Sequence, residues 1–258
     1  EVSETVSGTE RVLSHRIIGK MQEVEIMIYL TSDIHGDCRT FEKMLHKIHF
    51  TKQDQMYILG DAVDKGKENL RLIALIRKTG NIGLIKGNHE YLCERYLEGI
   101  IGASFWDACG GLSTRKEVDV LSESEKEDLA RYLKSLPIYK DVIIGENRYF
   151  LTHSGLNADY IVSGEGDVVD IEASVQEAVD HDQERYLFSN DIHYIPAAVR
   201  FDRQIIVGHY PTVLLPDWER PEIYRNRRYT DIDTGNERRR DGGRLACLRL
   251  EDGREYYV

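Results

Sequence analysis

Short apolar segments of this chain repeatedly end in clusters of charged and polar residues, and this recurrence constrains the fold more than any other feature. Apolar runs of strand length occupy residues 24–31, 56–59 and 83–86, and apolar residues at helical spacing separate them at 40–48 and 70–77. Strands that alternate with helices favour an α/β domain. Because ligands in such domains bind just beyond the carboxyl ends of the strands, the polar clusters are expected to share one edge of a sheet.

The rest of the chain adds a helical middle and a strand-rich end. Ser122 and Glu125 form the pattern of a capping box, which predicts that a helix begins there. An acidic stretch at residues 165–185 is also expected to be helical. The pair Asp252-Gly253 predicts a hairpin turn between the last two strands. Strands are predicted at residues 142–144, 149–152, 204–207, 228–233, 245–250 and 255–258.

Length and composition bound the organisation and the partners of the protein. The 258 residues suit one large domain or two small ones, and no apolar run reaches the roughly 18–20 residues of a membrane span. The net charge of −11 argues against partners that are nucleic acids or anionic membranes. The first twenty residues lack the apolar region of a signal peptide and the four cysteines are widely spaced, so we expect a cytoplasmic protein with unpaired thiols. Residues 1–25 are expected to extend a single domain at 26–258.

The polar clusters contain residue types that bind metal ions. Each cluster alone is as well explained by a solvated loop or a turn, so only the complete set is informative. A mixed set of oxygen and nitrogen ligands suits Mn²⁺, Fe or Zn²⁺ and does not suit Ca²⁺. Two ions that share one carboxylate could use all of these ligands, and paired ions ~3.5–4 Å apart catalyse in-line displacement at phosphorus. The candidate metal ligands are Asp33, His35, Asp61, Asn88, His153 and His209.

Six short motifs, in order along the chain, resemble those of the calcineurin-like metallophosphoesterases. They are Asp33-x-His35-Gly36, Gly60-Asp61-x-Val63-Asp64-x-Gly66, Gly87-Asn88-His89-Glu90, His153-Ser154-Gly155-Leu156, Gly208-His209-x-Pro211-Thr212 and Ile232-Asp233-Thr234-Gly235. The chain is most similar to the phosphoprotein phosphatase branch, with its bacterial and phage members, and to the symmetrical diadenosine-tetraphosphate hydrolases. The resemblance implies an α/β (α+β) fold, a central two-sheet β-sandwich flanked by helices, with a helical insertion around residues 91–148.

The resemblance also implies a role for each matched residue. His89 would protonate the leaving oxygen, and Asp64 would hold His89 in its charged form. Two divalent ions are the implied cofactors, with Mn²⁺ favoured and Fe or Zn²⁺ as alternatives, and a hydroxide between them would attack phosphorus. A first ion would be bound by Asp33 and His35, a second by Asn88, His153 and His209, and both by Asp61.

The chain differs from the family at two positions where family members bind the substrate phosphate. Lys65 stands where the family has Arg, and Asn190 stands where a second Arg is expected. Lysine keeps the positive charge but loses the bidentate geometry of arginine. The arginines near the last motif either form a solvated basic loop or bind the substrate phosphate in place of the absent family arginines. The candidates for that replacement are Arg238, Arg239 and Arg240.

These patterns predict a metal-dependent phosphomonoesterase of the serine/threonine phosphoprotein phosphatase type, with phosphotyrosine as a further substrate. The alternative is a hydrolase of dinucleoside polyphosphates, such as diadenosine tetraphosphate, or of another small phosphorylated metabolite. Gly242 and Gly243 follow the last motif much as in the tetraphosphate hydrolases. A catalytically silent phosphate-binding protein is a third hypothesis, and the complete ligand set argues against it. Trp106 and Trp218 are expected to pack rather than to bind substrate.

Overall fold

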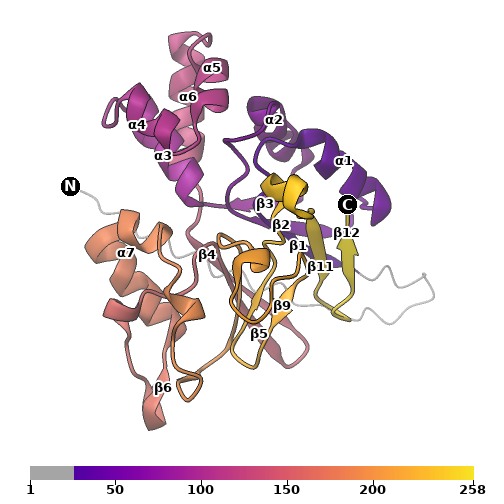
Figure 1. The fold of residues 1–258 in the computed structure, drawn as a ribbon, viewed down its shortest axis with the longest axis vertical. Coiled ribbons are helices and arrows are strands. Elements are labelled where there is room, and N and C mark those ends of the chain that lie inside the picture. The colour runs from indigo at the N-terminus through magenta and orange to yellow at the C-terminus, as the bar shows by residue number, and fades with distance from the viewer. Residues whose placement is uncertain (1–25) are drawn as a thin grey trace.

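The computed structural model describes residues 26–258, so the expected extension at residues 1–25 lies outside the described part. Two five-stranded sheets pack face to face, and helices cover their outer faces (Figure 1). The expected fold, a two-sheet β-sandwich flanked by helices, is confirmed.

The first sheet contains the strands that the alternating pattern predicted. Its strands are β1 (Ile28–Thr31), β2 (Gln55–Leu59), β3 (Ile82–Ile85), β11 (Ala246–Arg249) and β12 (Glu255–Tyr257), in the order β12-β11-β1-β2-β3. β1, β2 and β3 run parallel, while β11 is antiparallel to both of its neighbours. The connections are α1 (Cys38–Lys47) and α2 (Asn69–Thr79), as expected from the helical spacing between the strands.

The second sheet is built from the later part of the chain. Its strands are β4 (Tyr139–Ile144), β5 (Asn147–Thr152), β8 (Gln204–Val207), β9 (Tyr224–Arg225) and β10 (Tyr229–Asp231), in the order β4-β5-β8-β10-β9. β5, β8 and β10 run parallel. The strand predicted at 228–233 ends early because the Asp231 carboxylate accepts the Asp233 amide in a turn. A small third sheet pairs β6 (Val168–Val169) with β7 (Arg200–Phe201).

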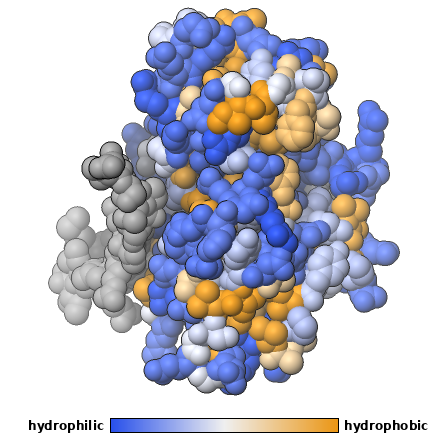
Figure 2. All heavy atoms as spheres, turned by 90° about the vertical axis from the view of Figure 1, so that its left-hand side faces the viewer, coloured by the Kyte–Doolittle hydropathy of each residue, from blue (hydrophilic) through white to orange (hydrophobic). Residues whose placement is uncertain are grey.

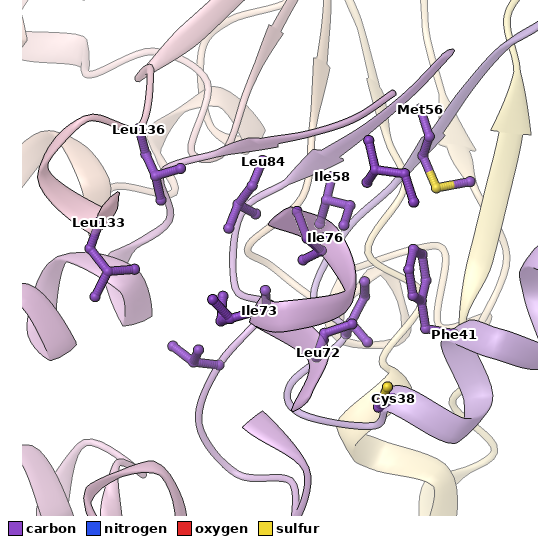
Figure 3. Packing of buried hydrophobic residues seen from close by; sticks show 14 of the residues in the cluster. Cys38, Phe41, Met56, Ile58, Leu72, Ile73, Ile76, Leu84, Leu133 and Leu136 are labelled. Carbon is purple, nitrogen blue, oxygen red and sulfur yellow. The ribbon is translucent and has the colours of Figure 1, made fainter. Parts of the chain in front are cut away.

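Three layers of buried hydrophobic side chains hold these elements together. One layer lies between the two sheets, one between the first sheet and its helices, and one between the second sheet and α7 (Ile171–Leu187). Figure 3 shows the second of these, where Phe41 of α1 and Leu72 of α2 lie near Met56 and Ile58 of β2. Burial of a side chain of this size contributes about 1.5–3 kcal/mol. The layers therefore fix the positions of the strand ends relative to one another.

A group of helices separates β3 from β4 and stands at the top of the view in Figure 1. Its members are α3 (Asn88–Leu97), α4 (Ala103–Ala108), α5 (Leu112–Val118) and α6 (Glu123–Lys134). The predicted capping box is confirmed, because Ser122 and Glu125 each accept the other's backbone amide with their side chains. The range 91–148 also contains β4, so its last part belongs to the second sheet.

The remaining helical segments are short 3₁₀-helices: η1 (Ala158–Tyr160), η2 (Glu165–Asp167), η3 (Asp191–His193), η4 (Thr212–Leu214) and η5 (Asn236–Asp241). The acidic stretch at 165–185 thus forms η2 and most of α7, which begins after the capping residue Asp170. The face that carries α7 and α4 is largely polar, with separate apolar patches (Figure 2). Within residues 26–258, no helix has both the length and the apolar character needed to span a membrane.

Candidate metal centre

The six predicted metal ligands lie just past the ends of parallel strands from both sheets. The sandwich thereby brings together residues as far apart in sequence as Asp33 and His209, which are 176 positions apart. All are buried except His209, which is partly exposed. They are Asp33 and His35 after β1, Asp61 after β2, Asn88 after β3, His153 after β5 and His209 after β8.

Several of these residues adopt the left-handed backbone region that L-amino acids disfavour. The φ angle is 50° at Asp33, 51° at His35, 55° at Asp61 and 74° at His209. Hydrogen bonds hold the first two turns, since the Asp33 amide donates to the Gly60 carbonyl at 3.1 Å and the His35 amide to the Asp61 carbonyl at 2.9 Å. Backbone strain of this kind concentrates at functional sites, where surrounding contacts maintain it.

The carboxylate of Glu90 ties the turns after β2 and β3 together. It is fully buried and accepts the backbone amides of Asp61, Ala62, Val63 and Gly87 at 2.8–3.2 Å. Burial, together with the charge of Asp61, raises the pKa of Glu90 to about 7. Glu90 was not among the predicted site residues, and its place in the third motif was the only sequence signal that could have pointed to it.

Two groups of side chains face each other across Asp61. Its Oδ2 atom lies 3.8 Å from His35 Nε2 and 3.7 Å from His89 Nε2. Its Oδ1 atom lies 3.3 Å from His153 Nε2, which in turn is 3.1 Å from His209 Nδ1. Each group brings three donor atoms close enough together to hold a metal ion. Asp61 is the residue that both groups share.

Asn88 and Asp33 complete the two groups. Asn88 Oδ1 lies 2.9 Å from His153 Nε2 and 3.0 Å from His209 Nδ1. Asp33 Oδ1 lies 4.0 Å from His35 Nε2, and Asp33 Oδ2 accepts the His209 amide at 3.0 Å. The structure therefore brings all six predicted ligands into one cluster.

Backbone carbonyls orient two of the imidazole rings. His35 Nδ1 lies 3.0 Å from the Val63 carbonyl oxygen, and His153 Nδ1 lies 2.7 Å from that of Leu59. A proton on Nδ1 satisfies each carbonyl and leaves the lone pair of Nε2 facing the cluster. Histidines that bind metals are commonly oriented in this way by a hydrogen bond from their other ring nitrogen.

Burial disfavours the charged forms of the carboxylates and imidazoles in this cluster. Burial, reinforced by the charge of Asp61, raises the pKa of Asp33 well above its usual value. Burial, with a contribution from His153, lowers the pKa of His209 to about 3, and burial also lowers the pKa of His153. Neutral imidazoles beside buried carboxylates are suitable donors for divalent transition metals. The chemistry of the donor set therefore fits a metal centre.

A buried imidazole–carboxylate pair adjoins the cluster. His89 Nδ1 lies 2.7 Å from Asp64 Oδ2, and both side chains are almost fully buried. Burial lowers the pKa of His89, but Asp61 and Asp64 outweigh this effect, so its pKa is raised. Trp106 is fully buried, as expected for a packing residue, yet its indole N–H also donates to Asp64 Oδ2 at 2.9 Å. Nothing in the sequence pattern signalled this contact.

Residues 26–242 match the family model described as calcineurin-like phosphoesterase. The chain belongs to this family. The match includes all six motifs that the sequence analysis identified, so the predicted family is confirmed. Calcineurin-like phosphoesterases use divalent metal ions, and the two groups around Asp61 could bind such ions.

Curated relatives of this calcineurin-like phosphoesterase carry two kinds of name. A symmetrical bis(5'-nucleosyl)-tetraphosphatase from Nitrosococcus oceani is 28% identical over 153 residues, 58% of this chain and 51% of that protein. Serine/threonine-protein phosphatase 2 from Escherichia coli is 28% identical over 134 residues, 52% of this chain and 58% of that protein. The chain spans about half the length of the curated relatives it matches.

Solved structures share the fold at low sequence identity. A crystal structure provisionally named a diadenosine tetraphosphatase has a TM-score of 0.57 at 16% identity and covers 92% of this chain and 95% of that one. A cold-active protein-tyrosine phosphatase from a Shewanella species has a TM-score of 0.54 at 14% identity, covering 90% and 80%. These likenesses concern the fold alone.

Two of the residues predicted to hold phosphate lie on the His35 side of the cluster. Lys65 Nζ lies 2.9 Å from His35 Nε2 and 3.9 Å from Glu237 Oε1. Arg238 Nε lies 3.8 Å from the same Glu237 oxygen, so one carboxylate is shared by Lys65 and Arg238.

Arg239 and Arg240, the other two candidate phosphate-binding residues, and Asn190 make no hydrogen bond or ion pair with the cluster among the described residues. Arg239 is directed to Asp37 and to Asn236, and Arg240 is exposed near the end of η5. Asn190 caps η3, and its backbone carbonyl accepts the amide of His193. The structure therefore joins Arg238 and Lys65 through Glu237, whereas Arg239 and Arg240 are exposed.

Proposed function

We propose that the chain is a phosphomonoesterase that uses two divalent metal ions and acts on phosphoserine and phosphothreonine in proteins. The observation that carries this proposal is the position of Asp61 between two groups of buried donor atoms. A carboxylate in this position can be shared by two metal ions, and paired ions are common in enzymes that displace groups at phosphorus. Phosphotyrosine is a further substrate under this proposal.

His35 lies beside Oδ2 of Asp61 and His153 lies beside Oδ1, and the proposed ligands are divided between two ions accordingly. When bound, the ions supply a nucleophile from water at neutral pH and offset charge on the phosphoryl oxygens. Mn²⁺ is the favoured ion, with Fe and Zn²⁺ as alternatives, because carboxylate, amide and imidazole ligands suit all three. The first ion would be held by Asp33, His35 and Asp61, and the second by Asp61, Asn88, His153 and His209.

His89 is proposed to protonate the oxygen that leaves phosphorus. Its Nδ1 is held by Asp64, and its Nε2 faces Asp61 at 3.7 Å, so Nε2 is directed into the cluster. A proton on Nε2 can pass to a leaving oxygen within hydrogen-bond reach. The negative charge of Asp64 stabilises the protonated ring before the transfer.

Lys65 and Arg238 are proposed to bind the substrate phosphate. Both lie within 4 Å of the Glu237 carboxylate on the His35 side of the cluster. An incoming phosphate can replace that carboxylate as the partner of both cations, because phosphate and carboxylate present similar acceptor oxygens. Arg239 and Arg240 would then act only at longer range, on charges that flank the phosphate.

A second candidate function is hydrolysis of dinucleoside polyphosphates such as diadenosine tetraphosphate. Symmetrical bis(5'-nucleosyl)-tetraphosphatases from several bacteria are among the curated relatives, and this observation favours it. Both functions would use the same cluster and differ in what surrounds the phosphate.

A substrate comparison tests the proposal. Manganese-loaded protein would be given a phosphothreonine peptide, diadenosine tetraphosphate and p-nitrophenyl phosphate, with His89→Ala as the catalytic control. We expect the peptide to have the highest kcat/KM, and we expect His89→Ala to lower it by about a hundredfold. A higher kcat/KM for diadenosine tetraphosphate would replace the first function with the second. Metal binding without turnover of any of the three would support a silent phosphate-binding protein instead.

A further inference from the structure

The helical insertion contacts the turn that carries Asp64 and Lys65 at three points. The Trp106 indole N–H, just before the end of α4, donates to Asp64 Oδ2 at 2.9 Å. The Asp64 amide donates to Thr114 Oγ1 of α5 at 2.9 Å. The Lys65 amide donates to the carbonyl of Gly110 at 3.2 Å. Both the side chain and the backbone of this turn are therefore held by the insertion.

The turn needs to be held, because its backbone is unfavourable. Asp64 has a φ angle of 71° and Lys65 has one of 62°, so two consecutive non-glycine residues occupy the left-handed region. Such a conformation persists only where neighbouring contacts maintain it. The amide bonds to Thr114 and Gly110 are contacts of this kind.

The indole ring of Trp106 is fixed in place. It is fully buried, and its ring centroid lies 4.9 Å from that of Tyr96 in α3. A Cβ atom on Gly111 would stand 2.2 Å from the indole Cδ1 and Nε1 atoms, so only glycine allows the chain to pass this close. The position of the indole N–H is thus defined by the packing of the insertion.

Asp64 receives its two side-chain hydrogen bonds on one oxygen. Oδ2 accepts from His89 Nδ1 at 2.7 Å and from Trp106 Nε1 at 2.9 Å. Oδ1 is buried and has no hydrogen-bond partner. The orientation of the carboxylate therefore depends on these two donors, and of the two only Trp106 lies outside the proposed reaction.

We propose that Trp106 is a positioning residue for proton donation by His89. Its N–H fixes the Asp64 carboxylate, which in turn fixes the His89 ring with Nε2 directed into the metal cluster. This inference rests on the proposed function, in which His89 protonates the leaving oxygen. The insertion thereby controls the acid group of the site rather than only covering it.

The leaving group of the substrate distinguishes this role from a structural one. p-Nitrophenolate departs readily without a proton. Phenolate is the more basic leaving group, so its departure depends more strongly on protonation. Loss of a positioned acid therefore slows phenyl phosphate more than p-nitrophenyl phosphate. A general loss of folded or metal-loaded protein slows both substrates by the same factor.

The test compares kcat on these two substrates for wild type, Trp106→Phe and His89→Ala, with Trp218→Phe as the matched control. We expect Trp106→Phe to lower kcat about tenfold or more on phenyl phosphate and less than about threefold on p-nitrophenyl phosphate. His89→Ala should show the same preference more strongly, and Trp218→Phe should change neither rate. Equal losses on both substrates in Trp106→Phe, beside a clear difference in His89→Ala, would overturn the inference while leaving the proposed function intact.

A second variant guards against misfolding of Trp106→Phe. Replacing Trp106 with benzothienylalanine keeps the size and shape of the ring but puts sulfur where the N–H stands. We expect this variant to have the thermal stability of wild type. We also expect it to show the same dependence on the leaving group as Trp106→Phe. If it behaves as wild type on both substrates, the N–H has no role and the inference is wrong.

A measurement that needs no turnover tests the contact itself. The chain has two tryptophans, so ¹⁵N labelling gives two indole signals, and Trp218→Phe assigns them. Substituting Asp64→Asn should shift the Trp106 signal and leave the Trp218 signal in place. An unmoved Trp106 signal would overturn the inference, even if wild type hydrolysed neither substrate and the proposed function failed.

Discussion

His89 Nδ1 lies 2.7 Å from Asp64 Oδ2, and the indole N–H of Trp106 in the helical insertion donates to the same oxygen. The proposed role of His89 as the acid depends on this pair. His89 is next in sequence to the proposed ligand Asn88, so the first turn of α3 carries both a proposed metal ligand and the proposed acid. The chemistry of the site therefore depends on how that turn is oriented.

Substituting Asp64→Asn should lower kcat on phenyl phosphate by about a hundredfold with little change in KM. The amide of asparagine carries no negative charge to stabilise the protonated imidazole of His89. Asp64 is not a proposed metal or phosphate ligand, so its replacement should leave substrate binding unchanged. Steady-state kinetics on metal-loaded protein would measure this, with Asp128→Asn on the surface of α6 as the control. A raised KM at unchanged kcat would show that Asp64 acts in substrate binding instead.

Substituting Glu90→Ala should destabilise the fold by about 3 kcal/mol or more. Four backbone amides that now bond to this carboxylate would be left buried and unsatisfied, at roughly 1–3 kcal/mol each before relaxation. Glu90→Gln keeps acceptor capacity and should cost less. Urea unfolding of both variants, beside the exposed control Glu127→Ala, gives the comparison. The account of Glu90 fails if Glu90→Ala and Glu127→Ala unfold at the same urea concentration.

Replacing Lys65 should change phosphate affinity in a predictable direction. Lys65→Ala should raise KM about tenfold by removing a cation beside His35, and Lys65→Arg should lower KM because a guanidinium binds phosphate through two hydrogen bonds. Exposed Lys67→Ala is the matched control. Competitive inhibition by inorganic phosphate would report the same order of affinities. A KM that is the same in all three variants would exclude Lys65 from phosphate binding.

The arginines of η5 should contribute unequally. Arg238 shares the Glu237 carboxylate with Lys65, whereas Arg240 is exposed near the end of η5. We expect the combined substitution Arg238→Ala, Arg239→Ala and Arg240→Ala to raise KM about tenfold, with most of the effect reproduced by Arg238→Ala alone. Initial-rate measurements with a phosphothreonine peptide would decide this. An unaltered KM in the triple variant would identify η5 as a solvated basic loop.

The alternation of strands and helices predicted an α/β domain, and the family resemblance implied the two-sheet sandwich. The polar clusters were expected just past the ends of strands, and the structure places them there. Asp33 lies two residues past the end of one predicted strand, and His153 lies one residue past the end of another. Strand ends could be located from apolar runs alone. The pairing of β5 with β8 and β10 in a second parallel sheet came from family resemblance, because periodicity does not reveal which strands become neighbours.

The residues that support the site could not be predicted in the same way. Glu90 bonds to amides that are 27–29 positions away, and Trp106 bonds to a carboxylate 42 positions away. Such contacts depend on how helices pack after folding, and no local pattern encodes them. Trp106 was expected to be a packing residue, and burial alone agrees with that expectation. Only the direction of its N–H shows the further contact.

The most direct test of the central claim, that Asp61 is shared by two catalytic metal ions, is a metal titration followed by activity. Metal-stripped protein would receive increasing Mn²⁺, in parallel with Zn²⁺ and Fe²⁺, while bound metal and hydrolysis of p-nitrophenyl phosphate are both measured. We predict that wild type binds two ions per chain, that turnover rises until the second ion is bound, and that Asp61→Asn loses both properties. Turnover that is complete with one ion, or unchanged in Asp61→Asn, would contradict the account.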